Sequence, residues 1–197
     1  MTLVSIVQAL ALEELLSNAF SADAVHGEGL DFVLRVLQIG GVFFMLVVVW
    51  HEYALGVVRF NYVVGLQDSL IPFAFGFSEF GLIEATYRAP LEYWFFWQAL
   101  ALGVGIWIYT HQMLRARNDP TAGDVAERHG RFSGPARIAT MAAAALTALA
   151  MGALIVLERP SAPIAVALVT ALLLGQVSFA ARSVSAWTEL TGSRDHD

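Results

Sequence analysis

The fold is decided by residues 32–82, which read FVLRVLQIGGVFFMLVVVWHEYALGVVRFNYVVGLQDSLIPFAFGFSEFGL. The first half is a long apolar run that leads into His51 and Glu52, and the second half carries Asn61, Asp68 and Pro72. Each half is long enough to cross the hydrocarbon core of a bilayer, about 30 Å thick, as a helix. The stretch therefore predicts two membrane-spanning helices joined by a short link. Ionisable groups inside a membrane are costly, so those in this stretch are candidate functional residues.

The composition of the whole chain indicates a polytopic helical membrane protein. The chain is 57% hydrophobic and only 14% charged, with a mean hydropathy of +0.63, whereas a soluble domain carries roughly a quarter charged residues. Apolar runs of about 20 residues recur, and the alternating pattern of a transmembrane β-barrel does not. The sequence has no cysteine, which excludes disulfides and thiolate metal sites. Its basic residues are all arginine and form no basic stripe, so we expect no nucleic-acid partner.

We expect an all-α transmembrane bundle of five to six helices. The predicted helices cover residues 3–20, 32–58, 62–83, 91–113, 138–157 and 164–181. The first is at the short end for a span, so it either crosses the membrane or lies at the interface. These helices group into an N-terminal membrane block at 1–113, a linker at 114–137, a C-terminal two-helix block at 138–182 and a polar tail at 183–197. Gly40 and Gly41 predict a thin helix face that another helix approaches closely.

The arginines predict the orientation in the membrane. Five of them lie in the 114–137 linker, which the positive-inside rule places in the cytoplasm. Alternating outwards, Arg59 and the C-terminus are also cytoplasmic, and the acidic segment 21–31 lies outside. If the first helix crosses the membrane, the N-terminus is cytoplasmic as well.

Three ionisable side chains are predicted to share one depth in the membrane. His51, Glu52 and Asp68 lie about 10 Å from the cytoplasmic ends of two neighbouring antiparallel helices. Because a histidine beside carboxylates can titrate near neutral pH, one interpretation is a proton- or cation-sensitive site. The other is a hydrogen-bonded cluster that fixes helix packing. His51 and His111 also lie near the cytoplasmic ends of separate helices, which leaves a bis-histidine haem b site as a further alternative.

The first helix carries two adjacent carboxylates. Glu13 and Glu14 are either end-of-helix residues at the outer surface or a cation-attracting ring at the mouth of a pore in an oligomer. No nucleophile–base arrangement, HExxH motif, P-loop or paired metal ligands occur in the sequence. We therefore predict that the protein is not an enzyme and has no metal site or cofactor.

Three stretches resemble the transmembrane protein 175 family of potassium channels. Asn61 is followed eleven residues later by Pro72-Phe73, which is similar to the family's third helix. Residues 42–50, with His51 after Trp50, are similar to its second helix, and residues 5–13 (SIVQALALE) look like the later part of its first helix. The family's Phe-Ser-Asp signature, which opens that first helix, does not stand before these residues. The resemblance therefore points to a divergent or truncated relative.

The resemblance implies a cation channel, permeable to potassium, that is built as a homotetramer of six-helix chains in a prokaryotic inner membrane. It implies that the first helix lines the pore through Ile6, Leu10 and Glu13, which are spaced three or four residues apart on one face. An apolar constriction of this kind gates by dewetting.

A polar network would hold this first helix in place, and its predicted members are His51, Glu52, Asn61 and Asp68. The alternative function is a non-conducting membrane subunit or scaffold of a larger complex. The Ala-rich stretch at 138–157 and the missing signature favour this alternative.

Overall fold

The computed structural model describes residues 2–21, 29–59, 66–118 and 135–192. Within these ranges the chain forms helices and no strand: α1 (Thr2–Phe20), α2 (Leu30–Arg59), α3 (Leu66–Arg88), α4 (Leu91–Asn118), α6 (Pro135–Glu158) and α7 (Ala162–Gly192). The predicted all-α fold is confirmed. All of these helices except α3 are long and apolar enough to cross a membrane. The chain is an integral membrane protein.

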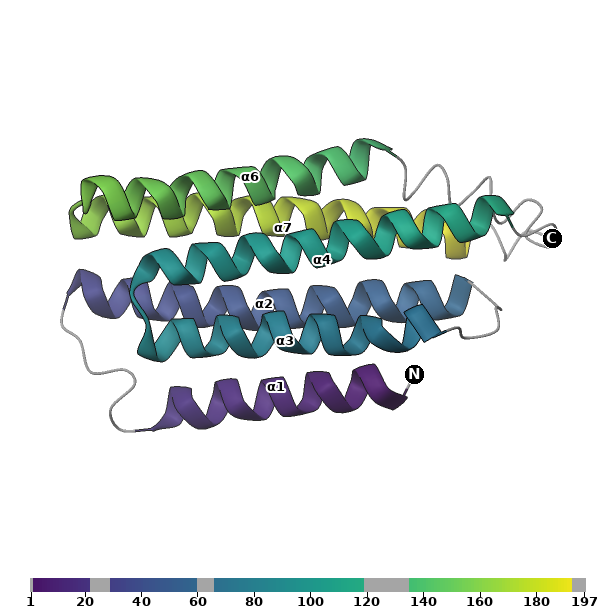
Figure 1. Ribbon diagram of the computed structural model, residues 1–197, viewed down its shortest axis with the longest axis horizontal. Coiled ribbons are helices and arrows are strands. Elements are labelled where there is room, and N and C mark those ends of the chain that lie inside the picture. Colours follow the sequence, from purple (N-terminus) through teal and green to yellow (C-terminus); the bar gives the residue numbers. More distant parts are fainter. Residues whose placement is uncertain (1, 22–28, 60–65, 119–134, 193–197) are drawn as a thin grey trace.

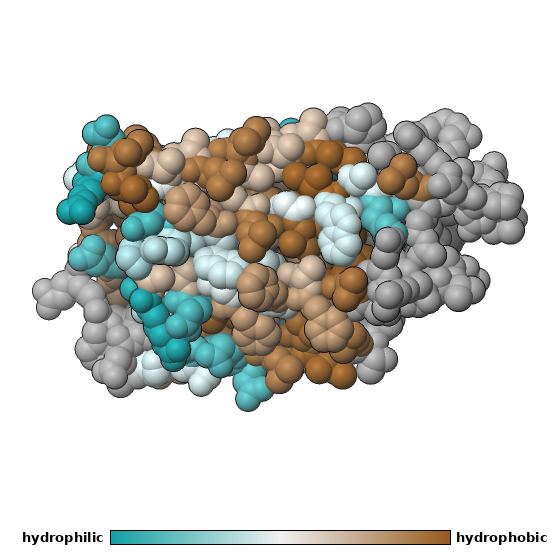
Figure 2. Space-filling model, in the orientation of Figure 1, coloured by the Kyte–Doolittle hydropathy of each residue, from teal (hydrophilic) through white to brown (hydrophobic). Residues whose placement is uncertain are grey.

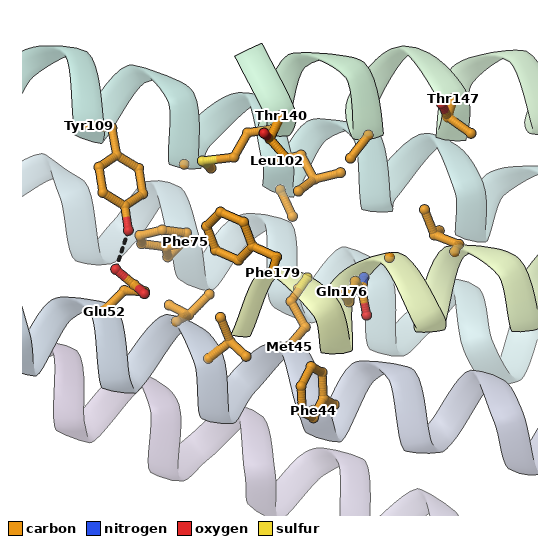
Figure 3. A pocket seen from close by; sticks show the side chains of 18 of the residues that line it. Phe44, Met45, Glu52, Phe75, Leu102, Tyr109, Thr140, Thr147, Gln176 and Phe179 are labelled. Atoms are coloured by element: carbon orange, nitrogen blue, oxygen red, sulfur yellow. Dashed lines mark hydrogen bonds between the residues drawn. The ribbon is translucent and has the colours of Figure 1, made fainter. Parts of the chain in front are cut away.

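The helices lie side by side in one elongated bundle (Figure 1). α1 lies at one edge and packs against α2 and α3, while α3 also packs against α4. α6 packs mainly along α4, and α7 packs mainly along α2. The two predicted membrane blocks therefore form one bundle. A cavity lies among α2, α4, α6 and α7, close to Phe75 of α3 (Figure 3).

Several helices run further than predicted. α3 continues past residue 83 to Arg88, and Glu84 and Arg88 pair across its last turn. It ends two residues before Pro90, because the residue that precedes a proline is disfavoured in the helical conformation. α4 reaches Asn118, and α6 begins at Pro135, which suits the first position of a helix. The linker is therefore shorter than the predicted 114–137. Residues 183–192 of the predicted polar tail are helical as part of α7.

α3 is less apolar than a typical membrane-spanning helix, but it lies within the bundle like the other helices. It is 23 residues long, or roughly 35 Å, and lies between α1 and α4. Its polar side chains Ser78, Glu79 and Thr86 are fully buried inside the bundle. Its outward face is apolar instead, with exposed Leu70, Phe73, Phe77 and Phe80 at helical spacing. Because the polar groups face the protein, a helix of lower hydropathy can pass through the same depth as its neighbours.

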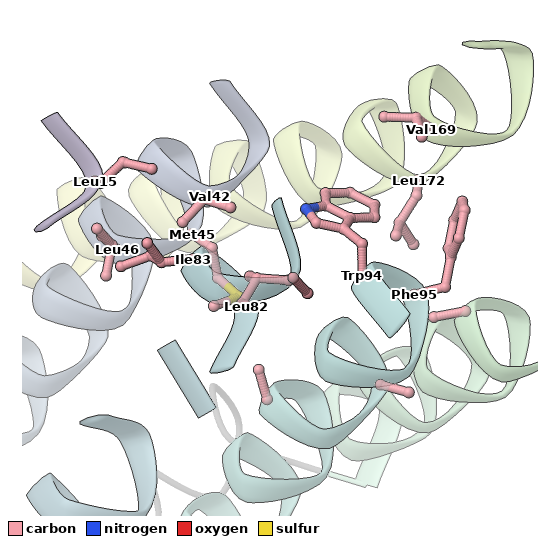
Figure 4. Close-up of a cluster of buried hydrophobic side chains, with 14 of the residues drawn as sticks. Leu15, Val42, Met45, Leu46, Leu82, Ile83, Trp94, Phe95, Val169 and Leu172 are labelled. Atoms are coloured by element: carbon pink, nitrogen blue, oxygen red, sulfur yellow. The ribbon is translucent and has the colours of Figure 1, made fainter. Parts of the chain in front are cut away.

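All six helices of the described ranges contribute to one apolar core, part of which is shown in Figure 4. Trp94 and Phe95 of α4 are fully buried in it and meet edge to face, with ring centroids 5.3 Å apart. The other large members come from the neighbouring helices: Leu15, Val42, Leu46, Leu82, Ile83, Val169 and Leu172. A core shared in this way holds the bundle together as a unit.

The outside of the bundle is also apolar. Figure 2 shows hydrophobic residues over much of one face, with hydrophilic residues gathered mainly near one end. Exposed large apolar side chains occur on every helix, for example Leu10, Phe43, Leu146 and Leu174. A water-soluble protein rarely exposes so continuous an apolar surface, whereas a bilayer solvates it.

Glycines set the closest helix approaches. A Cβ atom on Gly41 would lie 2.5 Å from Leu173 of α7 and 3.3 Å from Trp94 of α4, so the predicted thin face is confirmed at this residue. A Cβ on Gly40 would have no neighbour within 4 Å. In the same way, a Cβ atom on Gly76 would lie 2.6 Å from Val7 Cγ1 of α1. These positions are small so that side chains of the next helix can reach the backbone.

Candidate functional site

The predicted pore residues share the outward face of α1. Ile6 is 49% exposed and Leu10 is 50% exposed, and Glu13 is exposed as well. The opposite face of α1, with Val4, Ala11 and Leu15 among its residues, is buried in the bundle. α1 therefore presents an apolar stripe ending in a carboxylate to whatever lies outside the chain.

Two hydrogen bonds, one buried and one part-buried, attach the inward face of α1 to α3. Gln8 Nε2 donates to Glu79 Oε1 at 2.6 Å, and both side chains are buried. Near the other end of α1, Tyr87 Oη donates to the backbone carbonyl oxygen of Leu15 at 3.0 Å. Hydrogen bonds in an apolar interior are costly to break, so these two contacts fix both the depth and the rotation of α1.

A second polar group joins α2, α4 and α6. Glu52 Oε2 accepts a hydrogen bond from the Tyr109 hydroxyl (Figure 3). Glu52 Oε1 lies 3.0 Å from Arg137 Nη2, and both side chains of this ion pair are about 15% exposed or less. The Arg137 guanidinium also lies over the rings of Tyr109 and of Phe179 on α7, at 5.4 and 5.1 Å from the ring centroids. One arginine thus connects α6 to three other helices through charge and cation–π contacts.

The predicted polar network is described only in part. Glu52 contacts Tyr109 and Arg137, and neither partner was among its predicted members. His51 is half-buried on α2. Asn61 and the side chain of Asp68 lie outside the described residues, so their place in a network stays a prediction. His111 is half-buried on α4, and the C-terminal ends of α2 and α4 lie at the same end of the bundle (Figure 1).

The cavity extends through the bundle from the Glu52–Tyr109 pair. Its volume is about 310 Å³, and its walls are almost entirely apolar. Gln176 of the wall belongs to a part-buried amide pair, in which its Nε2 donates to Gln98 Oε1 at 2.9 Å. The cavity thus has a polar contact at each of two places, and most of the remaining wall is apolar. Among the described residues, no group of three His, Asp or Glu side chains could hold a metal ion.

Several of these residues were missed by reading the sequence. Gln8, Glu79, Gln98 and Gln176 are isolated polar residues within long apolar stretches, and the rule that intramembrane polar groups find partners could have singled them out. Their pairing could not be predicted, since the partners lie more than 70 positions apart in the chain. Arg137 was assigned to the linker, although Pro135 just before it signals the start of a helix.

No family model, curated protein or solved structure matches the chain.

Proposed function

We propose that this protein is the subunit of an oligomeric cation channel, permeable to potassium, in which α1 lines the pore. The observation that carries the proposal is the position of α1. It lies at the edge of the bundle with Ile6, Leu10 and Glu13 on its outward face, where neighbouring copies can bring these side chains around a common axis. The resemblance of residues 5–13 to the first helix of the transmembrane protein 175 family supports the same assignment.

Glu13 favours a pore over simple exposure to lipid. A carboxylate facing hydrocarbon is costly, whereas at a water-filled pore mouth it attracts cations. The neighbouring Glu14 is satisfied locally, because its Oε1 accepts a hydrogen bond from Asn18 Nδ2 at 2.7 Å. Leu10 and Ile6 lie about one and two turns before Glu13 on α1 and would then form the apolar constriction. The hydrogen bonds of α1 to α3 would keep this face pointed at the axis.

The proposed location is a prokaryotic inner membrane, with the C-terminal ends of α2, α4 and α7 on the cytoplasmic side. The arginines at the C-terminal end of α4 and in the segment between α4 and α6 support this orientation through the positive-inside rule. The assembly would be a homotetramer, as the family resemblance implies.

The test is potassium flux into liposomes that contain the purified protein. A polar side chain in an apolar constriction favours wetting, so Leu10→Asn and Ile6→Asn should raise the flux several-fold. Leu146 of α6 is 66% exposed and provides a matched control, because Leu146→Asn also places an amide on an exposed apolar surface away from α1. This control should conduct like the unmodified protein.

Two results would count against the proposal. If both α1 variants conduct like the unmodified protein, α1 does not line the pore. If the folded, oligomeric protein conducts no cation at all, the channel assignment is wrong and the non-conducting subunit becomes the better account.

A further inference from the structure

The cavity opens sideways between α6 and α7. Thr147 on α6 and Ala171 and Gly175 on α7 line the cavity and are also exposed on the surface of the bundle. A Cβ atom on Gly175 would meet nothing within 4 Å, so there is open space beside it. These small side chains leave a gap where two larger ones would close the wall.

This opening faces the lipid. The large side chains next to it, Leu146 of α6 and Leu174 and Val177 of α7, are exposed and apolar. Both helices are long and apolar enough to cross the membrane. A molecule that enters through this gap therefore comes from the hydrocarbon of the bilayer and not from water.

The volume of the cavity limits the size of the apolar group that it can bind. Its volume of about 310 Å³ is roughly twice that of an apolar cavity known to bind benzene, about 150 Å³. By this comparison it accommodates on the order of twelve carbon atoms. Its walls include Phe44, Met45, Val48, Leu172 and Phe179, which match an alkyl chain.

The polar atoms of the wall select a neutral hydroxyl group. Gln176 Oε1 and Gln98 Nε2 are buried, and neither has a hydrogen-bond partner among the described residues. Of these two side chains, Gln176 lines the cavity. A hydroxyl can donate and accept, so it pairs with the unsatisfied group of Gln176 whichever way the amide is turned. At the Glu52 end the carboxylate is already balanced by Arg137, so a charged head group would be desolvated without a counter-ion.

We propose that this cavity binds the alkyl chain of a neutral, hydroxyl-bearing membrane amphiphile, which enters from the bilayer between α6 and α7 and hydrogen-bonds to Gln176. The site uses no residue of α1. Ligand binding at this site can therefore be measured separately from conduction, and a failure of the channel proposal would leave this proposal standing.

The experiment uses a dodecanol that carries a photoreactive diazirine near its terminal methyl group, added to the protein in lipid nanodiscs. Peptide mapping should place the label on the cavity-lining parts of α2, α4, α6 and α7. Unlabelled dodecanol should compete about threefold to tenfold better than dodecane, the range expected for one net hydrogen bond, and better than dodecanoate. Gln176→Leu keeps the apolar volume and should bring the dodecanol-to-dodecane ratio close to one.

A matched pair of glycine variants tests the position of the opening. Gly175→Leu fills the gap and should reduce cavity labelling at least fivefold. Gly103→Leu on α4 adds the same side chain at an exposed position with nothing within 4 Å, and it should leave labelling unchanged. Both variants are first compared with the parent by size-exclusion chromatography, and Ala171→Leu replaces Gly175→Leu if the latter fails to fold.

Three results would overturn the proposal. The first is label spread evenly over the lipid-facing surface, and the second is equal competition by dodecanol, dodecane and dodecanoate. The third is unchanged cavity labelling in a folded variant with the gap filled.

Discussion

At the scale of single residues, two ion pairs of the same length show how burial changes the role of a charge. Arg137 and Glu52 lie 3.0 Å apart, and their side chains are 14% and 15% exposed. Arg88 and Glu84 are also 3.0 Å apart, but their side chains are 66% and 56% exposed. Water can replace the partner in the exposed pair, whereas loss of one partner in the buried pair leaves a carboxylate inside the bundle.

We therefore expect very different effects from the same substitution in the two pairs. Arg137→Leu should destabilise the protein by about 3–5 kcal/mol, and Arg88→Leu should cost less than about 1 kcal/mol. The measurement is the thermal loss of the monodisperse protein peak in detergent for each variant. Arg137→Lys keeps the charge but loses the planar group that lies over Tyr109 and Phe179, so it should fall between the parent and Arg137→Leu. Equal losses of thermal stability for Arg137→Leu and Arg88→Leu would show that the contacts of Arg137 do not stabilise the packing of α6 on its neighbours.

At the scale of the elements, the contact between α4 and α6 depends on a glycine. A Cβ atom on Gly152 of α6 would lie 2.8 Å from Phe96 Cε1 and 3.3 Å from the backbone carbonyl oxygen of Glu92. The backbone of α4 cannot move aside as the end of a flexible side chain can. Gly152 therefore sets how closely the two helices approach at this depth.

A larger side chain at this contact should separate the helices. Gly152→Leu is expected to destabilise the protein by about 1–3 kcal/mol through overpacking. Gly103→Leu is the matched control, because it gives the same gain in helix propensity at a position with open space. The two variants are compared by thermal unfolding in the same detergent. A melting temperature for Gly152→Leu equal to or above that of Gly103→Leu would contradict the close packing of α4 on α6.

At the scale of the whole molecule, α3 determines the topology. If α3 crosses the membrane as its neighbours do, four crossings separate the end of α1 from the turn between α6 and α7. Phe20, which is 84% exposed, and Ser161, which is also exposed, then lie on the same side of the membrane. If α3 did not cross, they would lie on opposite sides.

Single-cysteine labelling distinguishes these topologies. The chain has no cysteine, so an introduced one is its only thiol. Phe20→Cys and Ser161→Cys should react with a membrane-impermeant maleimide from the outside of intact cells. Leu114→Cys on α4 should be labelled only after the cells are opened, because it is exposed near the opposite end of the bundle. Labelling of Phe20→Cys and Ser161→Cys from opposite sides would exclude a membrane crossing by α3.

The sequence by itself determined the class of protein and most of the helices. Long apolar runs with few charges have one stable arrangement in a bilayer, which is the helix, because every backbone polar group must be satisfied within the segment. Two further local features were predictable: a proline interrupts a helix, as at Pro90, and a glycine has no side chain and permits a close approach, as at Gly41. The helix ends were less accurate, since polar residues such as Glu84 and Arg88 can extend a helix after the apolar pattern has ended.

Only the tertiary structure decided which polar residues meet and where the cavity lies. Gln8 and Glu79, Glu52 and Arg137, and Gln98 and Gln176 are pairs whose members lie far apart in sequence. Each polar residue in an apolar helix needs a partner, but that need does not say which helix supplies it. The choice depends on which helices become neighbours, and this is set by the combined packing of all their faces.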